Sequence, residues 1–306
     1  MSSTELPPIP AGHFADHQKG NQRFMTGFRL LILTALTIAM FAANSVLTRA
    51  ALSENAIGAG QFSMVRLASG TLMLALLVLV TGQRPKLLSP GRVQATIGLW
   101  AYMVGFSIAY IWLDAGVGAL ILFAVVQATM FTGGLISGEK VPTTRWIGMF
   151  IATGGLIFLF LPRIGAAPDL SGAAMMVFGA FGFAIYSLVG KKSTAPLPDT
   201  AVNFGFATVL TALIPWGALD PTPYSTYGVL LAVISGAITS GLGYALWYML
   251  MPALGATRAA VAQLSAPALA LIGGAIFLAE PITIGAMLAA VLIMVGVGVA
   301  SMPRAT

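Results

Sequence analysis

Long uninterrupted apolar stretches constrain this chain more than any other feature of its sequence. A helix that crosses the hydrocarbon core of a bilayer needs about 20 predominantly apolar residues, and stretches of that length recur along almost the whole chain. The predicted spans are residues 28–48, 59–81, 94–113, 117–137, 145–162, 171–190, 201–219, 227–250, 257–278 and 282–302. The short alternating segments of barrel strands are absent from the sequence. We therefore expect an all-α integral membrane protein with ten transmembrane helices.

Composition supports a membrane protein and excludes several functions. The chain is 58% hydrophobic and 8% charged, whereas a soluble domain carries about 25% charged residues. The net charge of +6 does not indicate nucleic-acid binding, because the basic residues lie at the ends of apolar runs and not in one patch. The absence of cysteine excludes disulfides and thiolate chemistry.

Both histidines, His13 and His17, lie in the polar stretch 1–27, which we interpret as a cytoplasmic tail. Their i, i+4 spacing would suit a metal ion only if this stretch were helical, and a solvated tail is the simpler interpretation. We expect no metal ion and no cofactor.

Lysine and arginine residues are distributed unequally between the two ends of the predicted spans. If the N-terminus is cytoplasmic, only Arg49 and Arg163 fall outside. The residues that fall inside are Lys19, Arg23, Arg29, Arg84, Lys86, Arg92, Lys140, Arg145, Lys191, Lys192, Arg258 and Arg304. Positive charge favours the cytoplasmic side, so this distribution predicts a multi-pass protein of the cell inner membrane with both termini in the cytoplasm.

Two similar segments indicate an internal repeat. FAANSVLTRA (41–50) and FAIYSLVGKK (183–192) share Phe-Ala at the start, Ser in fifth place and a basic residue in ninth place, 142 positions apart. GFSIAYIWL (105–113) resembles GYALWYMLM (243–251), and GGLISGEK resembles GAIFLAEP, with a similar offset. We therefore predict two five-helix repeats, residues 28–162 and 163–306.

An odd number of helices in each repeat makes the second repeat enter the membrane from the opposite side. Inverted repeats are typical of transporters whose substrate site lies near the midplane and opens alternately to either side. The predicted architecture therefore indicates alternating access.

The two copies resemble the EamA repeat of the drug/metabolite transporter superfamily, in its ten-helix branch, over about residues 28–302. The motifs that carry the resemblance are Glu139 and Glu280 with a glycine sixteen residues later (Gly155, Gly296), Phe62–Arg66–Leu67, GYALWY (243–248) and Pro267. The sequence departs from the family pattern at Val126, where a proline matching Pro267 is common. The resemblance implies a metabolite exporter, most similar to the amino-acid exporters.

Arg66 is the one charged residue clearly inside a predicted span. Charged groups at that depth are costly and usually functional, so Arg66 is either a clamp for a substrate carboxylate or a structural residue that snorkels or pairs with Glu54 or Asp114. The acidic residues fall at span ends. This pattern argues against a proton-coupling carboxylate and against polyanionic substrates, and it favours a neutral or zwitterionic substrate.

Uncharged polar residues at membrane depth are the first candidates for substrate contact. Gln127 lies near the middle of the fourth span, Asn44 in the first and Gln263 in the ninth. Each can bind an amino-acid backbone or simply bond a neighbouring helix. Pro267 removes a backbone donor from the ninth span, either lining a cavity or kinking the helix. We assign Pro267, Arg66, Glu139 and Glu280 to hinge or structural roles.

The family architecture implies that the third, fourth, eighth and ninth helices surround a central cavity. The residues expected on its walls by that analogy, together with Tyr186 of the sixth span, are Met103, Tyr110, Phe123, Tyr244, Trp247 and Tyr248. An aromatic belt at the membrane interface is the alternative explanation for the tyrosines and tryptophan.

The sequence thus predicts a transporter that exports small neutral or zwitterionic metabolites, with amino acids as the first choice. The alternatives are a multidrug or other metabolite carrier of the same fold, and a membrane scaffold or receptor without transport. An enzyme is not expected, because the spans hold no histidine, cysteine or buried pair of carboxylates. The expected partners are the small-molecule substrate and the lipid bilayer, with no nucleic acid, in a monomer or homodimer.

Overall fold

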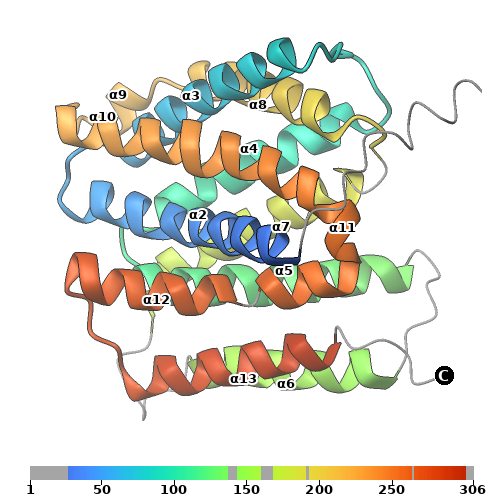
Figure 1. The fold of residues 1–306 in the computed structure, drawn as a ribbon. Helices are drawn as coiled ribbons and strands as arrows, with labels where there is room; N and C mark the ends of the chain where they lie inside the picture. The colour runs from blue at the N-terminus through green and yellow to red at the C-terminus, as the bar shows by residue number, and fades with distance from the viewer. Residues whose placement is uncertain (1–26, 137–142, 160–167, 191–192, 264, 301–306) are drawn as a thin grey trace, which may run out of the picture.

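All regular structure in the described part of the chain is helical (Figure 1). The computed structural model describes residues 27–136, 143–159, 168–190, 193–263 and 265–300. The helices are α2 (Gly27–Ser53), α3 (Ala59–Val80), α4 (Arg92–Ala109), α5 (Ala115–Ile136), α6 (Thr143–Leu159), α7 (Leu170–Gly190), α8 (Pro196–Ala212), α9 (Trp216–Leu219), α10 (Thr226–Val233), the π-helix η1 (Ile234–Leu242), α11 (Gly243–Gln263), α12 (Ser265–Leu278) and α13 (Ile284–Ala300).

Five helical segments are long and apolar enough to cross a membrane: 27–53, 59–80, 115–133, 170–190 and 226–250. Shorter apolar helices follow in α6, α12 and α13. These segments confirm the predicted all-helical membrane protein.

Two of the predicted span limits are wrong. The seventh span was expected at 201–219, but α8 ends at Ala212 and the short helix α9 follows. Pro215 lies between them and has no backbone N–H to continue the helix. A break was also expected at 251–256, yet α11 continues to Gln263. Helix-breaking residues such as those in this stretch are tolerated in membrane helices.

The helices pack side by side in layers (Figure 1). The pair α6 and α13 forms the outermost layer, and α5 and α12 form the next. Helix α2 packs mainly on η1, α11 and α12, whereas α7 packs on α4 and α5. The first helix of each predicted repeat therefore lies against helices of the other repeat.

Glycine brings α4 and α7 into backbone contact. A Cβ atom added to Gly98 would lie 2.7 Å from the carbonyl oxygen of Gly182, and one added to Gly182 would lie 2.5 Å from the carbonyl oxygen of Gly98. Small residues are the usual means by which membrane helices approach closely. The crossing of α4 and α7 thus requires glycine on both sides.

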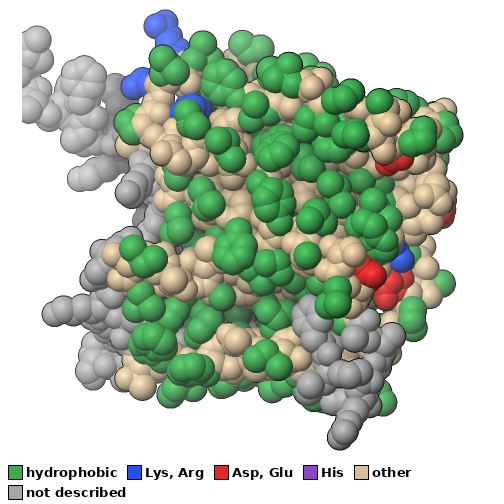
Figure 2. Space-filling view, turned by 180° about the vertical axis from the view of Figure 1, so that it is seen from behind, with side chains coloured by type: hydrophobic (Ala, Val, Ile, Leu, Met, Phe, Trp, Pro, Cys, Tyr) green, Lys and Arg blue, Asp and Glu red, His purple; other side chains and the backbone are tan. Residues whose placement is uncertain are grey.

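The molecular surface is apolar between two charged ends. Figure 2 shows hydrophobic side chains over most of one face, with basic groups at one end and mainly acidic groups at the other. Arg84 and Lys86 are exposed after α3, while Glu54 is exposed before it. Such a belt matches a protein surrounded by lipid, with charge confined to the water-facing ends.

Candidate functional site

The Arg66 side chain of α3 is fully buried in the helix bundle. Its Nε and Nη2 atoms each donate to Ser240 Oγ of η1, at 3.2 Å. The guanidinium carbon lies 4.9 Å from the centroid of the Phe106 ring and 5.8 Å from that of Tyr102, within the range of cation–π attraction. Arg66 therefore neither snorkels outward nor pairs with Glu54 or Asp114. Its Nη1 atom is buried without a hydrogen-bond partner in the described chain.

Three hydroxyl groups of the π-helix converge on Asn44 of α2. Asn44 Oδ1 accepts hydrogen bonds from Thr239 at 2.5 Å, from Ser235 at 2.8 Å and from Ser240 at 3.4 Å. A π-helix closes its hydrogen bonds from residue i to i+5, so residues four and five positions apart share one face. Ser240 therefore donates to Asn44 while it accepts from Arg66. We call Asn44, Arg66, Ser235, Thr239 and Ser240 the central polar cluster.

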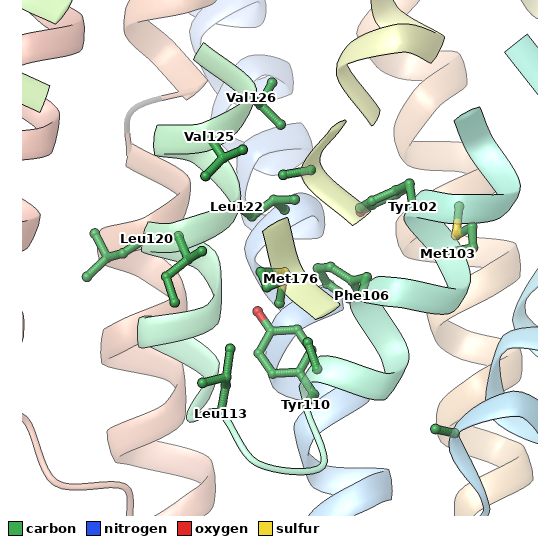
Figure 3. Close-up of a cluster of buried hydrophobic side chains, with 14 of the residues drawn as sticks. Tyr102, Met103, Phe106, Tyr110, Leu113, Leu120, Leu122, Val125, Val126 and Met176 are labelled. Atoms are coloured by element: carbon green, nitrogen blue, oxygen red, sulfur yellow. The ribbon is translucent and has the colours of Figure 1, made fainter. Parts of the chain in front are cut away.

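Three aromatic rings, two on α4 and one on the residue that caps its C-terminal end, follow each other at intervals of four residues. Tyr102 and Phe106 have ring centroids 5.3 Å apart, and Phe106 and Tyr110 4.8 Å apart. Figure 3 shows these rings on the side of α4 that faces Met176 of α7, whereas Met103 points away on the opposite side. Met103 is buried toward α3, where its carbonyl accepts from Ser63. The structure thus separates Met103 from Tyr110.

The predicted aromatic residues of α11 surround Phe41 of α2. Its ring centroid lies 5.7 Å from Tyr244 and 5.7 Å from Trp247. Phe123 of α5 is half-buried and packs on the same hydrophobic cluster as Trp247. Tyr244 also stacks on Tyr248, at 6.5 Å. The structure therefore places two of the predicted wall residues, Tyr244 and Trp247, against Phe41, while Tyr248 packs on Tyr244 and Phe123 on the cluster of Trp247.

Three hydroxyl groups from α7, α8 and α11 form a triangle. Tyr186 Oη lies 3.0 Å from Thr200 Oγ1 and 3.2 Å from Tyr248 Oη, and Thr200 donates to Tyr248 at 3.1 Å. Tyr186 is buried and Tyr248 half-buried. The triangle joins three helices of the second predicted repeat.

An ion-pair network closes one end of the bundle. Arg49 Nε donates to Glu280 Oε1 at 3.2 Å, and Arg49 Nη2 lies 3.5 Å from Asp114. Glu280 Oε2 accepts from the backbone N–H of Ala115 at 2.9 Å. Burial raises the pKa of the Glu280 carboxyl, an effect that the Ala115 N–H and Arg49 oppose and that Asp114 reinforces.

A second ion-pair network closes the opposite end. Arg92 Nη2 lies 2.6 Å from Asp199 Oδ1, and Arg92 Nη1 donates to Asn203 Oδ1 at 2.7 Å. The same guanidinium also donates to the carbonyls of Leu87, Lys86 and Asp199. Arg92 is buried although it begins a helix. Each of the two networks links the first half of the chain to the second.

The remaining predicted residues lie apart from the central polar cluster or outside the description. Gln127 and Gln263 are half-buried, and neither side chain forms a hydrogen bond with another described residue. Pro267 is buried in α12. Glu139 lies outside the described residues.

Sequence reasoning missed four residues that the structure makes central. Tyr102 and Phe106 carried a signal, because they precede Tyr110 at four-residue intervals. Ser240 lies in a run of small residues, 235–243, in which nothing distinguishes one serine from another. Arg92 was counted as a topology signal, and nothing in its local sequence indicates Asp199, 107 positions away.

Comparisons with known proteins point to a transporter family. Residues 170–302 match the model of the EamA-like transporter family. An uncharacterised protein of Pseudomonas aeruginosa is 40% identical over 276 residues, which cover 90% of this chain and 96% of that protein. A probable amino-acid metabolite efflux pump of Salmonella typhimurium is 26% identical over 206 residues, 60% of this chain and 66% of the pump. A crystal structure with 19% identity aligns with a TM-score of 0.63 over 88% of this chain and 95% of its own, and it supports the fold.

Proposed function

Because the chain belongs to the EamA-like transporter family of the drug/metabolite transporter superfamily, we propose that it exports small neutral or zwitterionic metabolites, and amino acids in particular. One observation carries the substrate class: the central polar cluster holds one cation and several hydrogen-bonding groups among aromatic side chains. Such a mixture suits a small polar molecule without multiple charges. The similarity to a probable amino-acid metabolite efflux pump supports the same class.

We further propose ten membrane spans in two inverted repeats, 28–162 and 163–306, after a cytoplasmic tail of residues 1–27. The pattern of packing supports this division, because the main contacts between the two halves have counterparts five spans later. Helix α4 packs on α7, and the α10–η1–α11 segment packs on α2. Helix α5 packs on α7 as α12 packs on α2, and α3 packs on η1 as α8 packs on α4. This exchange pattern is what two related units give when one is inverted.

The exposed charges support an orientation with both termini in the cytoplasm. The loop after α3 lies at the end where α2 begins (Figure 1). It carries the exposed Arg84 and Lys86, and exposed basic residues favour the cytoplasmic side. The network of Arg49, Asp114 and Glu280 then faces outward, and the network of Arg92 and Asp199 faces inward.

Alternating access requires that the two ends open in turn. In this proposal the outer network and the inner network are the contacts that break, one in each step. Both join the two predicted repeats, so relative motion of the repeats pulls on both. The π-helix lies between the two ends and carries three groups of the central polar cluster.

We propose that substrate contacts come from the central polar cluster and the aromatic residues around it. The proposed contact residues are Asn44, Tyr110, Phe123, Tyr186, Tyr244, Trp247 and Tyr248, with Gln127, Gln263 and Met103 as further predictions, and Pro267, Arg66, Glu139 and Glu280 in hinge or structural roles. Within the described helices the carboxylate is that of Asp199, which lies in the first turn of α8 and therefore near a membrane surface. We therefore propose exchange or downhill transport without a proton-coupling carboxylate at the midplane.

Counterflow in liposomes tests the proposal. Purified protein is reconstituted, the liposomes are loaded with one unlabelled amino acid at a time, and uptake of labelled threonine or methionine is followed with and without a pH gradient. Counterflow that is independent of the gradient is expected. Uptake that requires the gradient contradicts the coupling proposal. Counterflow with drugs or other metabolites and with no amino acid contradicts the substrate class and leaves the family assignment intact.

A further inference from the structure

The guanidinium of Arg66 is a buried cation without an anionic partner among the described residues. The acids that flank the bundle are engaged or distant: Asp114 and Glu280 pair with Arg49, and Asp199 pairs with Arg92. A charge at membrane depth is energetically costly unless it is paired. Aromatic faces and one serine hydroxyl compensate only part of that cost. Among the described residues the positive charge of Arg66 is therefore left without a counter-charge and with a donor atom unused.

The hydrogen bonds of Arg66 show which edge is available. A guanidinium carries five N–H donors. The bonds to Ser240 use the Nε donor and one donor of Nη2, and Nη1 has no partner. The free donors therefore lie along the Nη1–Nη2 edge, where two parallel N–H bonds can hold one carboxylate.

The neighbours of Arg66 fix the orientation of this edge. Phe106 lies against the guanidinium face, and Ser240 holds the opposite edge while it donates to Asn44. The plane and one edge are thus set before any ligand binds, which lowers the entropic cost of binding.

We propose that Arg66 binds the carboxylate of the transported amino acid through its Nη1–Nη2 edge, so that the transporter selects substrates that carry one carboxylate. Ser240 acts as a positioning residue that aims the guanidinium. This inference rests on the proposed amino-acid export and assigns to Arg66 a substrate contact beyond its proposed structural role.

Competition between threonine and threonine amide tests the assignment. Each compound inhibits counterflow of labelled threonine by wild-type protein if it binds, and the amide lacks the anionic group. The ratio of the two inhibitory concentrations measures the preference for the acid. A hydrogen-bonded charge contributes enough for a preference of about 10- to 100-fold for the acid. Arg66→Gln is expected to reduce this preference to about 1, and Arg66→Lys, which keeps the charge without the planar fork, to an intermediate value.

Arg49→Gln is the matched control, because it removes a half-buried guanidinium from the outer end. It is expected to change the rate of counterflow and to keep the wild-type preference. Gel filtration and Tm show whether each variant folds. If Arg66→Gln does not fold, Arg66→Lys serves as the test. A folded Arg66 variant with the wild-type preference overturns the inference and leaves the proposed function standing.

Absence of counterflow by wild-type protein with every amino acid overturns the proposed substrate class instead. The carboxylate site is then tested alone, from the rise in Tm that propionate gives to wild-type protein and to Arg66→Lys. A rise confined to the wild type supports a carboxylate site for another substrate. An equal response of the two proteins overturns this inference as well.

Discussion

Arg92 and Asp199 form a 2.6 Å ion pair that joins the start of α4 to the first turn of α8. The arginine is buried, and the aspartate side chain is 24% exposed. Arg92 also donates to three backbone carbonyls and to Asn203. One guanidinium therefore holds the loop after α3 and the two helices in a fixed arrangement.

Replacement of Arg92 is expected to destabilise the protein strongly. Arg92→Gln removes the ion pair and leaves the carbonyl acceptors around it unpaired, which costs about 3 kcal/mol. Unfolding of the purified protein in detergent by denaturant measures the loss. Arg84→Gln, at an exposed position of the same end, is the control and is expected to change the free energy of unfolding by less than about 0.5 kcal/mol. Equal effects of the two variants would contradict the structural role of Arg92.

Gly236 is expected to reject even a methyl group. A Cβ atom at this position would overlap the Arg66 carbonyl oxygen and the Ser69 hydroxyl, so Gly236→Ala must push η1 away from α3. Overpacking of this kind costs about 1–3 kcal/mol. Gly154→Ala in α6, where a Cβ atom meets nothing within 4 Å, is expected to be neutral or to stabilise by up to about 1 kcal/mol. Thermal unfolding of both variants gives the comparison, and a stable Gly236→Ala protein would be inconsistent with the packing.

The outer network predicts a pH dependence of stability that is specific to Glu280. Burial raises the pKa of this carboxyl despite the facing Arg49, with Asp114 adding to the rise. Its protonated form is therefore favoured more in the folded protein than in the unfolded chain, where the pKa is about 4.3. The resulting stabilisation is present at low pH and is lost as pH rises through the folded pKa.

Wild-type protein is thus expected to gain stability relative to Glu280→Gln as pH is lowered through the titration range of Glu280. The difference in Tm between the two proteins, measured between about pH 8 and pH 5, is the relevant quantity, because Arg49 and Asp114 are common to both. A difference that stays constant with pH would refute the raised pKa.

The hydroxyl triangle of Tyr186, Thr200 and Tyr248 is expected to show coupling. Tyr248→Phe removes one hydroxyl and costs about 1–2 kcal/mol, and Tyr186→Phe removes another. Because the two share partners, the double variant is expected to lose less than the sum of the single losses, by about 0.5 kcal/mol or more. A double-mutant cycle on the free energy of unfolding measures this term, with Tyr224→Phe at an exposed position as control. Strictly additive losses would exclude the coupling.

Most of the helices could be predicted from the sequence because membrane burial demands long apolar runs. The limits of α8 and α11 could not be predicted in this way. Hydropathy does not show whether a proline starts a helix, and it does not show whether a membrane helix continues through one. Helix α8 begins at Pro196, five residues before the predicted start, because a missing N–H costs nothing in the first turn.

The candidate site was less accessible to sequence reasoning. Asn44 was predicted from its depth, and Tyr244 and Tyr248 from the family resemblance. The structure places each in contact with other helices. The partners were not predictable, because Ser240 meets Arg66 across 174 positions of chain. The π-helix that aligns Ser235, Thr239 and Ser240 also has no periodic signal of its own in a run of small residues.

The packing of α2 and α7 has a consequence for how the protein is assembled. Helix α7 packs on α4 and α5, and α2 packs mainly on η1, α11 and α12. The first helix of each half therefore packs on helices of the other half. Neither 28–162 nor 163–306 can bury that helix by itself. The two halves are therefore expected to complete their tertiary packing together. The helices of the first half would insert into the membrane first and would pack fully only after the second half has been synthesised.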